Sequence, residues 1–219
     1  MKTVTVATAI LALAAGLASA EPAKPMPDIA LPAPRMAGGK PLMAALKDRQ
    51  SSRAFSAQPL PLQVVSDLLW AAYGINRPDS GLRTAPSARN WQEVDVYVVL
   101  PDGAYVYDAK TNSLRAVVKG DWRKLTGLQD FAATAPLNLV FVVDPAKMKG
   151  AAPEEQSLYF GADTGYISQN VYLFCASEGL ATVVRGSVDR EALAKALNLP
   201  ELRKIVFAQT VGYPATAKP

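Results

Sequence analysis

Histidine is absent from this 219-residue chain, and cysteine occurs once. Without histidine the chain can form neither a histidine-dependent zinc site nor a serine–histidine–aspartate triad. The single Cys175 excludes an intrachain disulfide, and as a nucleophile it would lack the histidine that commonly activates such a thiol. It lies in an apolar stretch with helical spacing, so we expect a buried core residue. These absences argue against hydrolysis and favour chemistry carried by a bound cofactor.

Long apolar runs and blocks of like charge are also missing. After the first twenty residues no apolar run is long enough to cross a bilayer. The 23 Lys and Arg residues are scattered among 19 Asp and Glu residues. We therefore expect no membrane span and no nucleic-acid partner. The Gly-x-Gly-x-x-Gly pattern of dinucleotide-binding domains is absent as well.

The first twenty residues have the features of an export signal. Lys2 precedes an apolar run from Val4 to Leu17, and Ala18-Ser19-Ala20 is a small-x-small cleavage site. No twin arginine is present, so the pattern predicts a cleavable Sec-type signal peptide over 1–20, cleavage after Ala20, and a periplasmic or secreted protein. The alternative is a buried N-terminal helix.

The mature chain divides into an arm and one domain. Residues 21–40 are rich in proline, with five prolines before Gly39, and predict an extended arm that wraps a neighbour or stays mobile. Residues 41–219 have the length of one domain with a full-sized core.

Periodicity in this domain predicts helices mixed with strands. Apolar residues at helical spacing predict helices at 41–48, 61–73, 121–133, 154–178 and 189–197. Alternating or wholly apolar runs predict strands at 94–100, 104–107, 114–118, 137–143, 181–184 and 205–211. Residues 76–90 predict a long loop. The order of elements indicates an α+β fold, a three-layer sandwich.

Three short segments carry the candidate chemistry. Arg49-Gln50-Ser51-Ser52-Arg53 places two guanidinium groups and two hydroxyls within five residues. Arginine presents planar, permanently charged donor pairs that match a phosphate. The other two segments are Thr84-Ala85-Pro86-Ser87-Ala88-Arg89-Asn90 and Ala181-Thr182-Val183-Val184-Arg185-Gly186. Taken singly, the three are a solvated helix end, a turn before a strand, and a buried strand whose arginine faces solvent.

In this order and spacing the three segments resemble the nitroreductase-like family of flavin mononucleotide (FMN) oxidoreductases. Leu69-Trp70-Ala71-Ala72-Tyr73-Gly74, followed by Arg83-Thr84-Ala85-Pro86-Ser87, is similar to the branch that holds exported members and the azoline-oxidising dehydrogenases of peptide modification. The resemblance covers residues 42–214. It implies a three-layer α-β-α sandwich with a central, mainly antiparallel sheet, and a homodimer with FMN at the subunit interface.

The resemblance also implies site residues. The phosphate and ribityl chain would be bound by Arg49, Gln50, Ser51 and Arg53, with Phe55 packed behind them and Lys218 as a further basic residue. Ser87, Ala88 and Asn90 would reach the flavin of the opposite subunit. Backbone N–H groups of Val183, Val184, Arg185 and Gly186 would face the ring edge. The long helix would form the dimer seam through Gly161, Ala162 and Gly165, with Gln169 and Asn170 bonding across it; the alternative is an intramolecular core helix.

Two positions depart from the family pattern. Trp91-Gln92-Glu93 replaces the usual Gln-Pro-Trp after the second segment, which leaves the contacts of Trp91 and Gln92 open. Arg185 stands where many relatives carry an acidic residue, and a cation beside the ring would favour the reduced, anionic flavin. Tyr105 and Tyr107 are candidate proton donors, but the sequence does not indicate where they lie relative to the site.

The leading hypothesis is an exported FMN-dependent oxidoreductase that transfers two electrons as hydride between an unidentified donor and a small organic acceptor. The donor would be a nicotinamide nucleotide or a periplasmic electron-transfer partner. One alternative is a non-catalytic member of the same fold that holds flavin or another planar ligand. Another is a structural partner in a secreted complex that uses the proline-rich arm.

Overall fold

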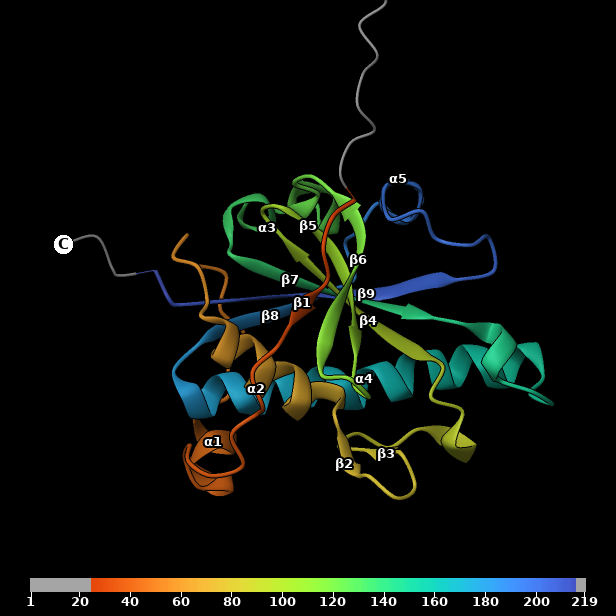
Figure 1. Cartoon of the computed structure of the whole chain (residues 1–219), viewed down its shortest axis with the longest axis horizontal. Coiled ribbons are helices and arrows are strands. Elements are labelled where there is room, and N and C mark those ends of the chain that lie inside the picture. Colours follow the sequence, from red (N-terminus) through yellow and green to blue (C-terminus); the bar gives the residue numbers. More distant parts are fainter. Residues whose placement is uncertain (1–24, 216–219) are drawn as a thin grey trace, which may run out of the picture.

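An antiparallel sheet of seven strands organises the chain in a computed structural model that describes residues 25–215. Its strand order is β1-β6-β5-β4-β7-β9-β8, and each pair of neighbours is antiparallel (Figure 1). The strands are β1 (Ile29–Ala30), β4 (Val94–Leu100), β5 (Gly103–Asp108), β6 (Ser113–Lys119), β7 (Leu137–Val143), β8 (Ala181–Arg185) and β9 (Lys204–Gly212). A small hairpin of β2 (Ile75–Arg77) and β3 (Leu82–Arg83) stands apart.

Helices cover both faces of the sheet. One face carries α1 (Leu42–Asp48), α2 (Leu62–Tyr73) and the long α4 (Pro153–Glu178), and the other carries α3 (Phe131–Thr134) and α5 (Arg190–Ala196) (Figure 1). Three short 3₁₀ turns complete the fold: η1 (Ala88–Asn90), η2 (Arg123–Thr126) and η3 (Pro145–Lys147). The three-layer α+β fold with an antiparallel central sheet is therefore confirmed.

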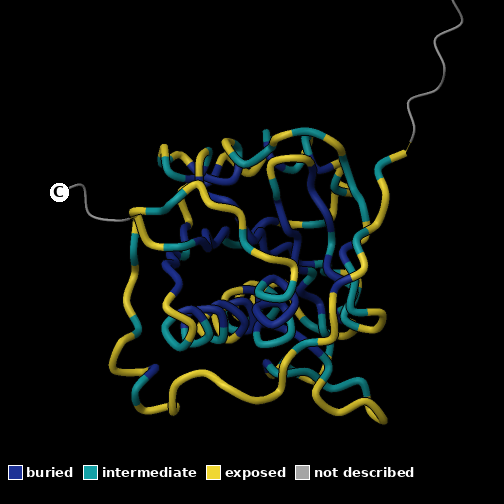
Figure 2. Tube along the Cα trace, turned by 60° about the vertical axis from the view of Figure 1, so that its left-hand side comes forward, coloured by how far each residue is buried: buried dark blue, intermediate teal, exposed yellow. Residues whose placement is uncertain are grey.

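Two apolar cores lie on the two faces of the sheet. The larger packs α2 and α4 against one face and contains Leu68, Phe141 and Val171. The smaller packs α5 against the other and contains Val142 and Leu193. Every residue of β7 is buried, as expected for a central strand covered on both sides. In Figure 2 the buried part of the trace runs through the middle of the molecule.

The ends of the predicted helices agree with local chemistry. Pro41 and Pro61 immediately precede α1 and α2, where a missing N–H has no helical partner to lose. The α4 helix ends at Gly179, which adopts the left-handed conformation (φ 70°). The Asp189 side chain accepts a hydrogen bond from the Ala192 N–H and caps α5. Cys175 is fully buried, as predicted, and burial raises the pKa of its thiol.

The helix predicted over 121–133 is wrong. The segment forms η2 and α3, separated by Gly127 in an extended conformation. A Cβ at Gly127 would overlap the buried guanidinium of Arg185, and the adjacent Thr126 carbonyl accepts a hydrogen bond from that group. The helix is therefore interrupted at Gly127 because the Arg185 guanidinium occupies the space beside it and bonds to the Thr126 carbonyl.

The arm packs on its own chain over its described part. Its β1 pairs with β6, and Leu31 is buried in the larger core. Arg35 forms an ion pair with the buried Asp67 at 2.6 Å, and the Lys40 N–H donates to Ser177 Oγ. The arm thus wraps the domain that follows it. The predicted signal peptide (1–20) and Lys218 lie outside the described residues.

Within 25–215 no helix is long and apolar enough to cross a membrane. The same part of the chain contains no group of three or more acidic or cysteine side chains placed to hold a metal ion.

Candidate functional site

The first and third candidate segments meet at the outer edge of the sheet. The Ser52 N–H donates to the Thr182 carbonyl at 2.9 Å. The Tyr172 hydroxyl, which projects from α4, accepts from the Val184 N–H at 3.0 Å and lies 2.8 Å from Ser51 Oγ. Direct hydrogen bonds therefore join the segment 49–53, which connects α1 and α2, to β8 and to α4, although all three are far apart in the sequence.

The two arginines of the first segment remain available to a ligand. The Arg49 guanidinium lies 5.3 Å from the centre of the Tyr172 ring, and Arg53 is exposed. Neither forms an ion pair among the residues that the structure describes. Phe55, behind them, bridges to Pro214 and stacks on Phe131 at 5.3 Å.

A cavity of about 490 Å³ opens beside this segment. Arg49, Gln50 and Ser52 line one side, and Tyr172, Ala181 and Thr182 line the other. Lys40 and Lys47 add positive charge at its rim, partly offset by the Lys40–Asp48 ion pair at 2.6 Å. A concave surface with hydroxyls and an excess of cations suits an anionic group.

The third segment supplies an edge strand with few free donors. Since Thr182 and Val184 direct their backbone groups outward, Val183 and Arg185 direct theirs toward β9. The Val184 N–H is occupied by the Tyr172 hydroxyl. The same alternation directs the N–H of the exposed Gly186 outward, at the end of the strand. Of the four predicted residues, Gly186 is the one best placed to donate to a ligand.

Arg185 is buried, with 5% of its surface exposed, so it does not face solvent. Its guanidinium donates to the Thr126 carbonyl at 2.9 Å, to Asn138 Oδ1 at 2.9 Å and to Thr210 Oγ1 at 2.8 Å. Its Nε has no partner, and no carboxylate pairs with it among the described side chains. Burial lowers the pKa of Arg185 to about 10, so the group remains charged at neutral pH.

The second segment lies elsewhere in the same chain. The Ala88 N–H donates to Asp163 Oδ2 at 2.9 Å, and Arg89 pairs with Glu155 at 2.6 Å, so the segment rests on the N-terminal half of α4. Asp163 precedes Tyr172 by nine residues, which is about 14 Å along a helix. Within one chain, Ser87, Ala88 and Asn90 are therefore separated from the first and third segments.

The residues after this segment are held by their own chain. Trp91 stacks edge-on against Tyr159 at 5.7 Å. The Gln92 amide accepts from Arg83 Nε at 2.7 Å and donates to the Gly81 carbonyl at 3.1 Å. Arg89, Asn90 and Gln92 all adopt positive φ, at 48°, 54° and 49°. Trp91 and Gln92, whose contacts could not be predicted from the sequence, thus contact residues of their own chain. The backbone beside them is strained.

Sequence reasoning missed the buried carboxyl groups beneath this loop. Glu93 and Asp163 are 0% and 2% exposed. Burial and the neighbouring Asp163 raise the pKa of Glu93 to about 7. The sequence offers little signal for them, because a charged residue beside a strand is normally exposed.

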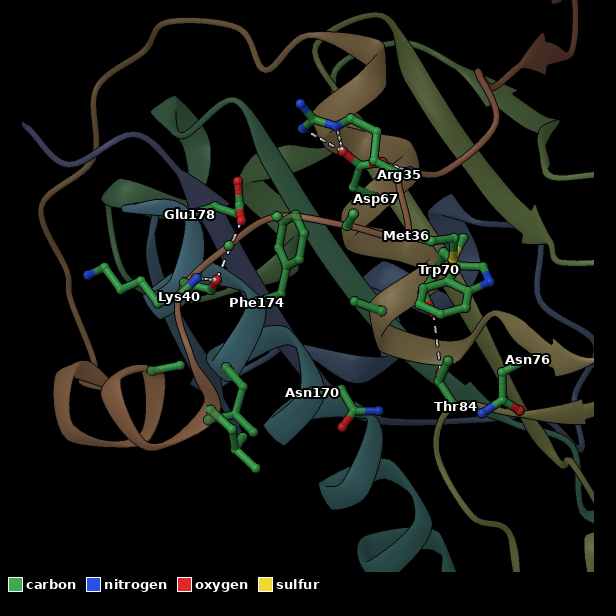
Figure 3. Close-up of a pocket in the computed structure, with 18 residues that line it drawn as sticks. Arg35, Met36, Lys40, Asp67, Trp70, Asn76, Thr84, Asn170, Phe174 and Glu178 are labelled. Carbon is green, nitrogen blue, oxygen red and sulfur yellow. Dashed lines mark hydrogen bonds and ion pairs between the residues drawn. The ribbon is translucent and has the colours of Figure 1, made fainter.

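A second cavity, of about 560 Å³, was also missed (Figure 3). It lies between the arm, α2 and the C-terminal half of α4, and Trp70 and Phe174 form its aromatic walls. The Arg35–Asp67 ion pair stands at its rim. Its arm residues carry no pattern that marks a site, so no signal in the sequence points to it.

Tyr105 and Tyr107 are remote from β8. Both project from β5, which β4, β7 and β9 separate from β8, a distance of about 19 Å at the usual strand spacing. Their hydroxyls donate to Asp102 and Asn112. Burial raises the pKa of each to about 12. Neither is placed to donate a proton at this site.

Comparisons with known proteins identify the family. The model of the nitroreductase family matches residues 46–213, more than half of the chain. A Methanocaldococcus jannaschii protein assigned as a nitroreductase is 29% identical over 163 residues, covering 70% of this chain and 82% of its own length. A crystal structure of a Ralstonia eutropha protein with the same assignment is 44% identical, with a TM-score of 0.83, covering 86% of this chain and 90% of that one.

More distant structures share the fold. A chain of the Escherichia coli microcin synthetase McbBCD complex gives a TM-score of 0.69 at 20% identity, covering 77% of this chain and 70% of that one. The NADPH:FMN oxidoreductase of Vibrio harveyi gives 0.58 at 22% identity, covering 81% and 72%. With the matched residues spanning all three candidate segments, this chain is a member of the nitroreductase family.

Proposed function

We propose that the chain is an exported, homodimeric, FMN-dependent oxidoreductase that transfers two electrons as hydride between a donor and a small organic acceptor. The observation that carries the proposal is the hydrogen-bonded junction of Ser51, Tyr172 and Val184. It places two arginines without acidic partners beside the outward edge of β8. A flavin nucleotide needs both features, a cationic phosphate site and backbone donors at its ring edge.

The donor set at this junction fits FMN. Arg49 and Arg53 would hold the phosphate, with Ser51 as a neutral donor. The outward N–H of Gly186 would donate at the ring edge, where negative charge gathers on reduction. When bound, FMN supplies the hydride chemistry itself.

Arg185 would act through its charge. Its guanidinium lies under the end of β8 with no carboxylate to neutralise it, on the opposite face of the sheet from Tyr172. A permanent cation near the ring edge would favour the anionic reduced flavin over the neutral oxidised form. We therefore expect Arg185 to raise the reduction potential without contacting the ring.

A second copy of the chain would complete the site. Ser87, Ala88 and Asn90 lie against α4 about 14 Å from Tyr172, and the resemblance to the family assigns these residues to the flavin of the opposite subunit. The outer face of α4 is suited to such a contact: Leu158 and Tyr166 are exposed, and the Cα atoms of Gly161 and Gly165 face open space. Gln169 is exposed on the same helix, whereas Asn170 donates to the Ala72 carbonyl of its own chain.

The donor and acceptor are assigned by class. The family relation to NADPH:FMN oxidoreductases makes a nicotinamide nucleotide one donor class. Export through the predicted signal peptide makes a periplasmic electron-transfer protein the other. A small organic molecule is the acceptor class that the resemblance to the family implies.

The second candidate is a non-catalytic flavin-binding protein of the same fold. It is favoured by the absence, among the described side chains at the junction, of a titratable group placed to give a proton to a substrate. Reduction of the bound flavin by NADH, NADPH or dithionite, followed by reoxidation with a quinone, separates the two. Reoxidation of the reduced flavin by the quinone supports the oxidoreductase, whichever reductant was used, and reduced flavin that the quinone does not reoxidise supports the binding protein.

The binding proposal is tested with variants of the chain from residue 21 onward. The parent protein should take up added FMN, quench its fluorescence and sediment as a dimer. Arg49→Ala/Arg53→Ala should weaken FMN binding by about a hundredfold, since two charge-assisted contacts are lost. Arg115→Ala, an exposed arginine on the distant β6, is the control. Equal FMN affinity in the parent and the double variant would reject the proposed phosphate site.

A further inference from the structure

Two carboxyl groups share one buried position beneath the loop that carries Ser87 and Asn90. Glu93 directly precedes β4, and Asp163 projects from the buried face of α4. Both are almost completely buried, and they accept hydrogen bonds from the adjacent loop residues Ser87 and Ala88, which brings the two carboxyl groups close together. Because a carboxylate can only accept hydrogen bonds, the two groups can bond to each other only when one of them is protonated.

No cation neutralises this pair. Arg83 lies over the ring of Tyr73 at 4.4 Å and donates to Gln92 and to the Tyr73 carbonyl. Lys147 pairs with Asp95 at 2.8 Å. Throughout 25–215, neither Glu93 nor Asp163 forms an ion pair. Glu93 Oε1 and the Tyr73 hydroxyl have no hydrogen-bond partner. Two ionised carboxylates here would repel each other in a setting of low polarity.

The pair also fastens the loop. Ser87 Oγ donates to Glu93 Oε2 at 3.1 Å, and the Ala88 N–H donates to Asp163 Oδ2 at 2.9 Å. Ser87 Oγ in turn accepts from the Gln92 N–H at 2.8 Å. The backbone between these contacts is held with three non-glycine residues at positive φ, a conformation that needs support from its surroundings.

We propose that Glu93 and Asp163 are positioning residues that hold one proton between them, and that loss of this proton releases the loop over residues 86–92. With the proton present, the pair draws Ser87 and Ala88 onto α4. Without it, Glu93 and Asp163 separate, and both loop contacts move with them. The consequence for flavin rests on the proposed function: the released loop no longer presents Ser87 and Asn90 to a partner's cofactor.

Trp91 reports on this loop directly. It is one of three tryptophans, so Trp70→Phe/Trp122→Phe leaves it as the sole fluorophore of this kind. Its emission and acrylamide quenching are recorded from pH 5 to 9 in protein free of FMN. We expect a transition near neutral pH toward a more quenched, solvent-exposed Trp91. Far-ultraviolet circular dichroism across the same range checks that the protein stays folded.

Glu93→Gln is the decisive variant, because an amide donates permanently to Asp163 and imitates the protonated pair. It should abolish the transition and hold Trp91 in its low-pH state. Asp163→Asn should do the same through the opposite partner. A parent protein with no transition, or a transition that persists unchanged in Glu93→Gln, would overturn the proposal. Since no flavin is present, these results stand whether or not the proposed function does.

A second arm tests the consequence for flavin. FMN affinity of the parent should fall about tenfold relative to Glu93→Gln between pH 6 and pH 8. Comparing the two proteins cancels the ionisation of the FMN phosphate itself. If neither protein binds FMN, the proposed function fails while the loop result stands. If both bind and the ratio stays constant with pH, the link between pair and cofactor is rejected.

Discussion

Two of the places where the molecule buries charge without an ion pair deal with it in opposite ways. Arg185 keeps its charge, because three neutral oxygens from η2, β7 and β9 accept hydrogen bonds from its guanidinium. Glu93 and Asp163 have few donors and no cation, so they share a proton instead. The difference shows that buried charge is set by the supply of neutral partners as much as by a counterion.

The two places also differ in how they respond to pH. The pKa of Arg185, about 10, lies well above neutrality, so its charge is constant from pH 5 to 9. The pKa of Glu93, about 7, lies within that range. We therefore expect the contacts of Arg185 to contribute the same stability throughout this pH range, and those of Glu93 to change with pH.

The largest effect is expected for Arg185→Ala. It leaves the Thr126 carbonyl without its donor and opens a void between three elements, which should lower the free energy of unfolding by about 3 kcal/mol. Urea unfolding at pH 6 and pH 9 measures it. The loss should be the same at both pH values, and a loss confined to one of them would contradict a contribution of Arg185 that is independent of pH.

Gly127→Ala should cost about 2 kcal/mol, because its Cβ would overlap the Arg185 guanidinium. The backbone at this position is extended, so the cost comes from the contact and not from the conformation. In an Arg185→Ala background the same substitution should cost close to nothing. A double-mutant cycle without coupling between the two positions would show that the guanidinium does not occupy this place.

Glu93→Gln should change stability in a way that depends on pH. The folded pKa of Glu93 exceeds its ordinary value of 4.5, so the wild-type protein loses stability as pH rises from about 4.5 through 7. The variant lacks this loss and should be more stable than wild type by about 2 kcal/mol at pH 8. At pH 5 the two should be nearly equal. Unfolding curves that differ equally at both values would contradict a shared proton.

The smallest effect is expected for Arg89→Ala. Its ion pair with Glu155 is at the surface, with 59% and 28% of the side chains exposed, and should be worth less than about 0.5 kcal/mol. The pH transition of Trp91 should keep its midpoint in this variant. If Arg89→Ala released the loop at every pH, the Arg89–Glu155 ion pair, and not the carboxyl pair, would be what holds the loop in place.

Local chemistry made much of the fold predictable. Wholly apolar β7, the proline starts of α1 and α2, and the glycine end of α4 each follow from neighbours in sequence. The break at Gly127 does not, because its cause is a side chain 58 residues later in the chain. Propensity over 121–133 favours a helix, and tertiary contact overrides it.

The site was predictable in part for the same reason. The sequence identified the segments at 49–53 and 181–186, and the structure brings them together through Tyr172, a residue that the sequence did not single out. Arg185 and Glu93 were harder, since charged residues are normally exposed and only the fold reveals the oxygens and the carboxyl group that surround them. The separation of Ser87 from Arg49 likewise needed the length of α4.

FMN binding is tested most directly by the absorption spectrum and mass of whatever remains bound to the protein purified from cells that express the full chain. The account predicts yellow protein with flavin absorption bands, one FMN per chain by mass spectrometry, and colourless protein from the Arg49→Ala/Arg53→Ala variant. Colourless wild-type protein that takes up no added FMN would contradict it.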